Sequence, residues 1–202
     1  MSAASRRRTA ALVAALACAL PFGSAQAAHS GDNAATAIIE QDDGRAFDFA
    51  WDISRQRGDD PVLNRNSATA RARCARCRAR AIAFQIVLVA GSPKTVVPVN
   101  TAEAVNVECT ACESVAEARQ FVRVVPKPVR FTGRGRAILA DVRDDLEALE
   151  ASDPPIDQLH TAVETQEARV RTVLREELVL KSDPDKDARV LERRTLQAAD
   201  RD

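Results

Sequence analysis

The sequence predicts an α+β protein in which three tandem antiparallel β-hairpins precede an αα-hairpin. An Asn-x-Ala-x-Ala motif begins at Asn33, Asn66 and Asn100, at intervals of 33 and 34 residues, and such a period indicates a repeat architecture. Within the repeats, side chains alternate with period two, as they do in strands. Beyond residue 131 the apolar residues recur every three or four positions, which is typical of helices.

Residues 1–27 have the features of an export signal. Residues 6–8 are basic, residues 10–20 form an apolar run that is too short to span a bilayer, and Ala25-Gln26-Ala27 offers a small-residue cleavage site. We therefore expect a secreted, extracytoplasmic mature chain. A lipoprotein anchor at Cys18 is the less favoured alternative, because the preceding Leu16 stands one place away from the usual leucine position.

Residues 28–128 are expected to form the repeat domain. Its three units cover about residues 33–56, 66–90 and 100–125. The second and third units each carry a CxxC motif, whereas the first has Gln41-Asp42-Asp43-Gly44 in its place. Asp-Gly is a strong signal for a tight hairpin turn. Each unit is therefore predicted to be a strand, a tight turn and a strand.

The second segment of each unit is predicted to be a strand, and that of the middle unit a strand buried on both faces. In the middle unit, Ala79, Ala81, Ala83, Gln85, Val87 and Val89 would share one face, and Ile82, Phe84, Ile86 and Leu88 the other. A run that is apolar on both faces is typical of a strand between two layers. Residues 113–123 of the third unit are good helix formers, so a helix is the competing interpretation there.

Charged residues occupy equivalent positions around the turns. Glu40, Arg73 and Glu108 precede the three turns, and Arg78 and Glu113 follow two of them. If the hairpins lie side by side in register, Arg73 would lie between two carboxylates. Each such pair stabilises a register by at most about 1 kcal/mol. The alternative is that these charges are solvated and never meet.

A helical hairpin is expected at residues 131–180. Two apolar stripes with helical spacing flank Ser152-Asp153-Pro154-Pro155, which would end the first helix and cap the second. The charged tail, residues 181–202, is expected to be disordered.

Export would leave four cysteines in the mature chain: Cys74, Cys77, Cys109 and Cys112. Disulfides within each CxxC turn, disulfides between neighbouring turns and a four-thiolate zinc site all remain open. An oxidising compartment favours disulfides, and the 31 residues between the two pairs exceed the usual zinc-ribbon spacing of about 15–20. A redox-catalytic CxxC would need a βαβ context that the sequence does not show, so a structural role is favoured.

Five arginines surround the first CxxC motif: Arg71, Arg73, Arg76, Arg78 and Arg80. They could bind a polyanion such as a wall polymer or a phospholipid headgroup. The favoured alternative is that they pair with the acidic residues of the flanking repeats. Nucleic-acid binding is not expected, because the formal net charge is zero and only 3% of residues are aromatic.

The sequence lacks the common catalytic motifs. Its two histidines, His29 and His160, are not arranged as HExxH, and neither a Gly-x-Ser-x-Gly elbow nor a glycine-rich phosphate loop is present. His160 is expected to be a surface residue of the second helix. These observations favour a protein that is not an enzyme and has no cofactor.

The repeats resemble those of exported actinobacterial proteins of unknown function, whose units run N-x-A-x-A, C-x-x-C and A-x-Q-x-V. The resemblance covers residues 33–125 and the segment FTGRGRAILADVRDDLEAL from Phe131. Some longer relatives are named peptide zinc metalloproteases, because similar repeats accompany a membrane peptidase-like segment. Neither that segment nor the metal motif occurs in this sequence, so the resemblance implies a repeat module and no activity.

The sequence therefore predicts an exported, non-enzymatic structural or interaction module stapled by paired cysteines. Its partner would be an unknown protein or a component of the cell envelope, and no transmembrane segment is expected in the mature chain. The alternative is a zinc-binding accessory module of a membrane peptidase or peptide-export system, in which the four cysteines hold the metal.

Overall fold

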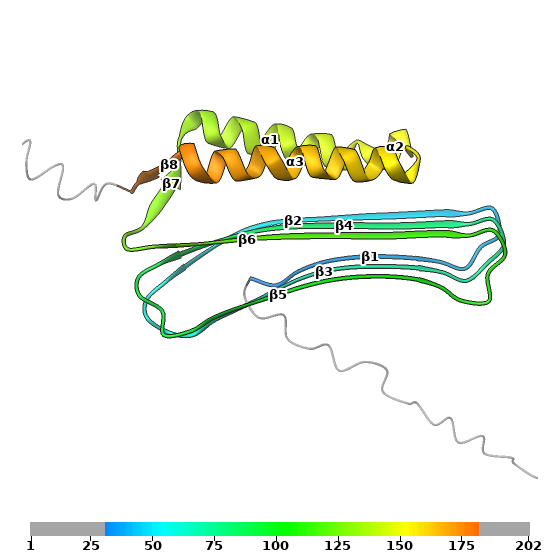
Figure 1. The fold of residues 1–202 in the computed structure, drawn as a ribbon, viewed down its shortest axis with the longest axis horizontal. Helices are drawn as coiled ribbons and strands as arrows, with labels where there is room; N and C mark the ends of the chain where they lie inside the picture. Colours follow the sequence, from blue (N-terminus) through cyan, green and yellow to red (C-terminus); the bar gives the residue numbers. More distant parts are fainter. Residues whose placement is uncertain (1–30, 182–202) are drawn as a thin grey trace, which may run out of the picture.

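The computed structural model describes residues 31–181, which form two stacked sheets and a helical hairpin that lies on one of them (Figure 1). The predicted signal peptide, residues 1–27, lies outside the described residues. So does the predicted tail, residues 181–202, apart from Lys181.

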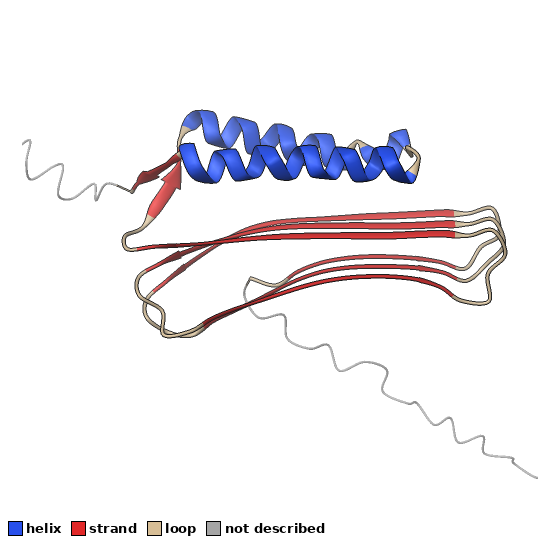
Figure 2. Ribbon diagram, in the orientation of Figure 1, coloured by secondary structure: helices blue, strands red, loops and turns tan. Residues whose placement is uncertain are grey.

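Each repeat contributes two long strands, one to each sheet. The strands are β1 (Asn33–Ile39), β2 (Arg45–Arg57), β3 (Val62–Ala72), β4 (Arg78–Ala90), β5 (Val96–Asn106) and β6 (Glu113–Val125). The sheet orders are β1-β3-β5 and β2-β4-β6. We call β2-β4-β6 the covered sheet, because the helices lie on it, and β1-β3-β5 the open sheet (Figure 2).

The prediction of antiparallel hairpins is wrong, because all six strands pair in parallel. Each turn carries the chain from one sheet to the other, so the two strands of a repeat face each other through their side chains. Their backbone hydrogen bonds go instead to the equivalent strand of the next repeat, which places Asn33, Asn66 and Asn100 side by side. This β-solenoid encloses the small-residue faces of both strands, whereas an isolated hairpin would leave them at the surface.

The layer between the two sheets is rich in alanine near the CxxC turns. The buried alanines there are Ala35, Ala37, Ala68, Ala70, Ala72, Ala79, Ala81, Ala83 and Ala118. Side chains of this size let the two sheets pack closely. The small residues of each repeat thus bring the two sheets together.

The asparagines of the repeat motif form a ladder through this layer, in which Asn33 and Asn66 are buried and Asn100 is exposed at the edge. Asn33 Nδ2 donates to Asn66 Oδ1, and Asn66 Nδ2 donates to Asn100 Oδ1, both at 2.8 Å. Asn66 Nδ2 also lies 3.1 Å from the carbonyl oxygen of Ala83 in the covered sheet. Each asparagine therefore joins neighbouring repeats and ties the two sheets together.

The opposite face of the covered sheet packs against the helices. Its buried residues in β4 are Ile82, Phe84, Ile86 and Leu88, and the helices supply Leu139, Val142, Leu146, Leu159, Val163, Val170 and Val173. The predicted burial of β4 on both faces is confirmed. The second segment of the third repeat, β6, is a strand that pairs with β4 along its whole length, so the competing helical interpretation is wrong.

The predicted helical hairpin is confirmed. It comprises α1 (Gly133–Glu147), the single turn α2 (Leu149–Ser152) and α3 (Ile156–Glu176). The Thr132 side chain caps α1 by accepting from the backbone N–H of Gly135 at 2.9 Å. A short antiparallel pair that the sequence did not predict, β7 (Val129–Phe131) with β8 (Leu178–Leu180), closes the base of the hairpin. Within residues 31–181, no helix is long and apolar enough to cross a membrane.

Candidate functional site

Three similar turns stack at one end of the solenoid, and the third is one residue longer than the other two. Asp43, Arg76 and Ala111 hold equivalent places in them, and all three adopt left-handed backbone conformations with φ of 57°, 53° and 55°. The turns are bonded to one another: Asp43 N–H donates to Ala75 O at 2.9 Å, and Arg76 N–H to Thr110 O at 2.8 Å. Residues at equivalent places in successive turns are therefore close neighbours.

The four cysteines lie in the second and third of these turns. The structure joins Cys74 to Cys77 and Cys109 to Cys112, with Cα–Cα distances of 6.0 and 5.9 Å, which suit disulfides. The two pairs differ in access to solvent. Cys77 is fully buried and Cys74 is 8% exposed, whereas Cys109 and Cys112 are both half-buried.

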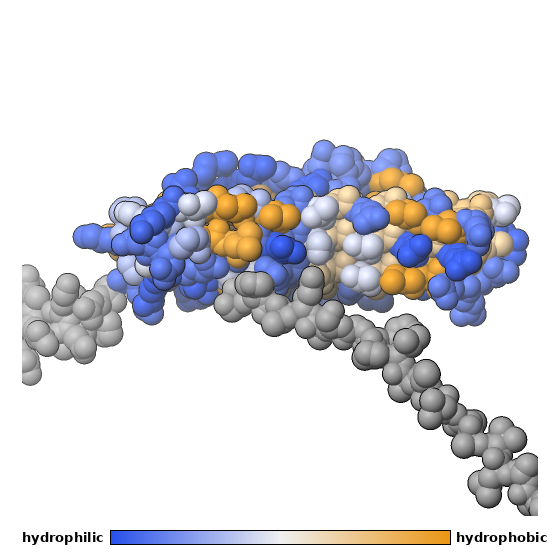
Figure 3. All heavy atoms as spheres, turned by 90° about the horizontal axis from the view of Figure 1, so that it is seen from below, coloured by the Kyte–Doolittle hydropathy of each residue, from blue (hydrophilic) through white to orange (hydrophobic). Residues whose placement is uncertain are grey.

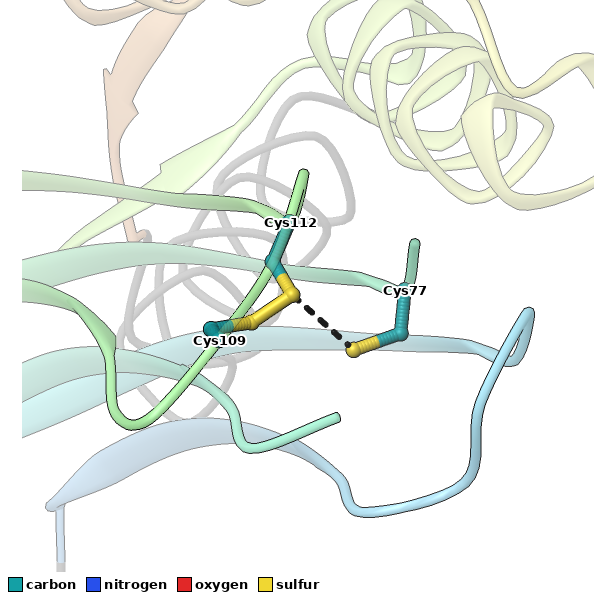
Figure 4. Close-up of side chains that lie close together, drawn as sticks. All are labelled: Cys77, Cys109 and Cys112. Atoms are coloured by element: carbon teal, nitrogen blue, oxygen red, sulfur yellow. Dashed lines mark hydrogen bonds between the residues drawn. A yellow bond between two sulfur atoms is a disulfide. The ribbon is translucent and has the colours of Figure 1, made fainter. Parts of the chain in front are cut away.

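The two disulfides touch each other. Cys112 Sγ lies 3.5 Å from Cys77 Sγ across the boundary between the two repeats (Figure 4). The carbonyl oxygen of Cys74 lies 3.0 Å from Cys109 Sγ and 2.8 Å from Cys112 Sγ. Stacking of the repeats has thus gathered the sulfur atoms of both motifs into one cluster.

The same cluster has the dimensions of a metal site. The sulfur atoms of Cys77, Cys109 and Cys112 lie within 4.8 Å of one another, and thiolates bound to one tetrahedral zinc ion lie about 3.8 Å apart. Only reduced cysteines can supply the thiolates. The 31-residue spacing that argued against zinc in the sequence is no obstacle in this fold, because parallel stacking places equivalent positions together whatever the length of chain between them.

The first turn has the same shape without cysteine. Gln41 and Gly44 stand at the places of the two cysteines, and the Gly44 N–H donates to Gln41 O at 3.1 Å. The Asp42 side chain accepts from the Ala75 N–H at 2.8 Å. Asp43 forms an ion pair with Arg76 at 2.7 Å, and this hydrogen-bonded partner lowers the pKa of the Asp43 carboxyl. Hydrogen bonds therefore hold the first turn where disulfides hold the other two.

The five arginines do not form one patch. Arg71 projects from the open sheet, and among the residues that the structure describes it forms no ion pair. The other four each bind a carboxylate: Arg73 with Glu108 (2.8 Å), Arg76 with Asp43 (2.7 Å), Arg78 with Asp153 (2.9 Å) and Arg80 with Glu113 (2.5 Å). Pairing with acids of the flanking repeats thus accounts for three of them. Arg73 contacts Glu108 but, within the described ranges, forms no ion pair with Glu40.

A cluster that the sequence did not reveal joins the helices to the solenoid. Arg45, Arg78 and Arg80 all contact the carboxylate of Asp153 at 2.9 Å. These residues line a polar cavity of about 260 Å³ together with Glu150. Asp153 has a φ of 40° and ends α2, so the turn between the helices points its side chain at three arginines of the covered sheet. With Glu113 and Glu150 nearby, the charges balance, and the cluster serves to position the helical hairpin.

His160 makes a second polar contact between a helix and the covered sheet. Its Nδ1 lies 2.8 Å from Glu117 Oε1 in β6, and its Nε2 lies 3.1 Å from Glu164 Oε1. The hydrogen bond with Glu117 raises the pKa of the His160 imidazole, and the charge of Glu164 acts in the same direction. His160 is thus an exposed helix residue, as predicted, with a docking contact that spacing alone did not show.

The outer face of the open sheet carries exposed apolar side chains. Figure 3 shows this face, on which apolar and polar groups alternate. The large apolar residues there and their exposed fractions are Ile38 (55%), Leu63 (40%), Val97 (46%) and Val99 (37%). The helices lie on the other sheet and leave this face uncovered (Figure 1).

Comparison of the chain with protein-family models, with curated proteins and with solved structures gave no match.

Proposed function

We propose that this chain is an exported, non-enzymatic structural or interaction module whose cysteine pairs staple stacked turns. One observation carries the proposal. The first turn adopts the same left-handed conformation as the other two and is held by Asp42 and Asp43 instead of cysteines. A position that hydrogen bonds can fill in one repeat is better explained as a structural link than as a reaction centre.

The magnitude of the effect suits a staple. A disulfide that closes a loop of four residues stabilises a fold by about 2 kcal/mol in the chain-entropy description. The end of the solenoid that carries the three turns needs such support. The alanine side chains packed between the two sheets there bury little apolar area per residue.

Serine variants test the structural role. We expect Cys74→Ser/Cys77→Ser and Cys109→Ser/Cys112→Ser each to lower the free energy of unfolding by about 2 kcal/mol in urea titrations. We also expect the unmodified protein to show no catalytic turnover in insulin reduction with a dithiol. Turnover that disappears in either variant would show a thiol oxidoreductase and contradict the proposal.

The open sheet supports the interaction part of the proposal, with an unknown protein or cell-envelope component as the partner. Leu63 and Val97 pair directly in this sheet, and adjoining exposed apolar side chains that are rimmed by polar groups are typical of a contact site. We expect the variant Leu63→Ser/Val97→Ser to lose crosslinking to a partner in intact cells while it unfolds at an unchanged temperature. The matched control is Ile156→Ser/Val179→Ser, which removes exposed apolar side chains elsewhere. Equal losses in both variants would argue against this face.

A second candidate function is that of a zinc-binding accessory module of a membrane peptidase or peptide-export system, with four cysteine thiolates as the ligands. The proximity of three sulfur atoms within 4.8 Å favours it. Mass spectrometry of the purified mature protein separates the two. Loss of four hydrogen atoms with no bound metal supports the staples, whereas four thiols with one stoichiometric zinc ion would support the accessory module.

A further inference from the structure

The two CxxC turns differ in how readily a reductant can reach them. Cys74 and Cys77 are 8% and 0% exposed, whereas Cys109 and Cys112 are half-buried. Thiol–disulfide exchange requires the attacking sulfur to reach the sulfur that it attacks. A dithiol in solution can therefore attack the Cys109–Cys112 bond, but the protein itself shields the Cys74–Cys77 bond.

The more exposed pair, Cys109–Cys112, lies against the buried pair, Cys74–Cys77. Cys112 Sγ is 3.5 Å from Cys77 Sγ (Figure 4), which is contact distance for two sulfur atoms. The parallel register fixes this approach, because Arg78 and Glu113, the residues that follow the two cysteines, pair directly in the covered sheet. A thiolate at Cys112 would need little movement to attack Cys77.

Both product thiols would also have hydrogen-bond acceptors in place. The carbonyl oxygen of Ile39 lies 3.4 Å from Cys74 Sγ, the sulfur that would leave. The carbonyl oxygen of Cys74 lies 3.0 Å from Cys109 Sγ. A thiol S–H at either position can donate to these carbonyls, so the exchanged state does not bury unpartnered thiols.

We propose that the two turns exchange disulfides with each other, so that reduction of the exposed pair opens the buried one. An external dithiol first reduces Cys109–Cys112; it is oxidised to its own disulfide, and its two hydrogens remain on the cysteine thiols. Cys112 then loses its proton and attacks Cys77 Sγ. The Cys112–Cys77 bond forms, the Cys74–Cys77 bond breaks, and Cys74 leaves as a thiolate that takes up a proton. This second step consumes no oxidant or reductant.

Through this exchange, the redox state of the Cys109–Cys112 turn controls whether the buried Cys74–Cys77 bond can open. The exchange rests on the disulfide form of the cluster that the proposed function adopts, and it adds an intramolecular reaction that a purely passive staple would not perform. The cross-repeat disulfide would also link the second repeat covalently to the third, which neither local disulfide does.

The test uses the full-length protein with Cys109→Ser, which leaves Cys112 as a free thiol beside Cys77. We expect iodoacetamide to label Cys74 as well as Cys112, and we expect a Cys77–Cys112 disulfide in tryptic peptides. Cleavage after Arg76 separates Cys74 from Cys77 and makes the assignment unambiguous. In the matched control, Cys112→Ser, we expect the label to stay on Cys109. Labelling confined to Cys112 in the first variant would overturn the proposal.

A rate measurement keeps the proposal testable if either single variant folds poorly. We expect dithiothreitol to reduce the Cys74–Cys77 bond about ten-fold more slowly in Cys109→Ser/Cys112→Ser than in the unmodified protein. The double variant has no Cys112 thiolate to attack Cys77. Equal rates would contradict the exchange. Local disulfides that never exchange would defeat this inference alone, whereas four thiols with bound zinc in the unmodified protein would defeat the proposed function as well.

Discussion

Left-handed backbone at three equivalent turn residues is the feature that makes the turns stack. Asp43, Arg76 and Ala111 hold this conformation although none is glycine, and each non-glycine residue there costs roughly 1–2 kcal/mol. Asp43 and Arg76 offset a small part of this cost through their exposed mutual ion pair, whereas Ala111 is exposed and has no polar side chain to do so. Ala111 is therefore the place where this strain can be relieved most simply.

We predict that Ala111→Gly raises the free energy of unfolding by roughly 1 kcal/mol, because glycine adopts a positive φ without a steric cost. Urea titration of the purified protein measures this change. Ala75→Gly is the control, since Ala75 lies in the neighbouring turn without a positive φ and its substitution should destabilise the protein. A loss of stability in both variants would contradict the interpretation.

Asp52 departs from the pattern of its equivalents. It pairs in register with Gln85, which pairs with Gln120, and Gln120 Nε2 donates to Gln85 Oε1 at 2.7 Å. Asp52 thus stands at the end of an amide ladder. Its Oδ2 atom is buried with no hydrogen-bond partner among the described residues. Burial raises the pKa of the Asp52 carboxyl above its ordinary value of 3.8, although a hydrogen bond with Gln85 opposes the shift.

We predict that Asp52→Asn stabilises the protein at pH 7 and has little effect near pH 3. A raised carboxyl pKa means that the folded state binds the proton more tightly than the unfolded state does, so this group destabilises the fold once the pH exceeds 3.8. Melting temperatures of both proteins across this range measure the difference. Asp48→Asn is the control, because Asp48 accepts from the Thr36 N–H and should gain nothing. A constant difference at all pH values would contradict the assignment.

At the scale of elements, the asparagine ladder holds the repeats in register. Asn66 is fully buried and lies in the middle repeat. It accepts from Asn33 and donates to Asn100, and it also contacts the carbonyl oxygens of Ala83 and Arg119. Its removal would leave several buried polar groups without partners at once.

We predict that Asn66→Ala lowers the free energy of unfolding by about 2–4 kcal/mol, because each buried polar group that loses its partner costs about 1–3 kcal/mol. Asn100→Ala is the graded control, since Asn100 is exposed at the edge of the stack and makes fewer contacts. Chemical denaturation of both variants provides the comparison. An equal or larger loss for Asn100→Ala would show that the ladder does not act as described.

The sequence identified the strands but not their partners, for a physical reason. Period-two alternation places Ile82 and Ala83 on opposite faces whether a strand pairs with its own repeat or with the next one. The asparagine motif held the missing signal: Asn33, Asn66 and Asn100 can satisfy one another only if the equivalent strands are neighbours. The sequence left open whether the two CxxC motifs meet, because a spacing rule for local metal motifs does not describe residues that stacking brings together.

The contacts between helices and sheet were beyond sequence reasoning altogether. Nothing in the spacing of Arg45, Arg78 and Arg80 points to Asp153, which lies more than seventy residues further along the chain. The aspartate was instead expected to end one helix and cap the next. Tertiary packing decides such contacts, and the helical period fixes only which face is apolar.

At the scale of the whole molecule, Asp153 fixes the far end of the helical hairpin to the solenoid. Its carboxylate is 16% exposed and binds Arg80, whose side chain is 4% exposed. Removal of one partner from a buried ion pair costs about 3–5 kcal/mol. Arg80 retains Glu113 and the carbonyl oxygen of Pro154 as partners, which moderates the loss.

We predict that Asp153→Asn lowers the free energy of unfolding by about 2–3 kcal/mol and speeds hydrogen exchange in α1 and α3 before it does so in the sheets. Asparagine keeps the tolerance of a positive φ, so the effect reports the lost charge. Arg45→Gln is the control, because the Arg45 side chain is 63% exposed and an exposed ion pair contributes less than about 1 kcal/mol. Uniform protection changes across helices and sheets would contradict separate docking.

The position of the helices sets how many repeats this molecule can hold. α1 contacts β2 and α3 contacts β6, the two outermost strands of the covered sheet. Two strand spacings amount to about 9.6 Å, which matches the 8–10 Å between the axes of packed helices. The two packed helices are thus as wide as the three strands of the covered sheet, one from each repeat. A fourth repeat would add a strand whose apolar face no helix covers, so a longer array would need another helix. Loss of one repeat would leave one helix without a strand to pack against.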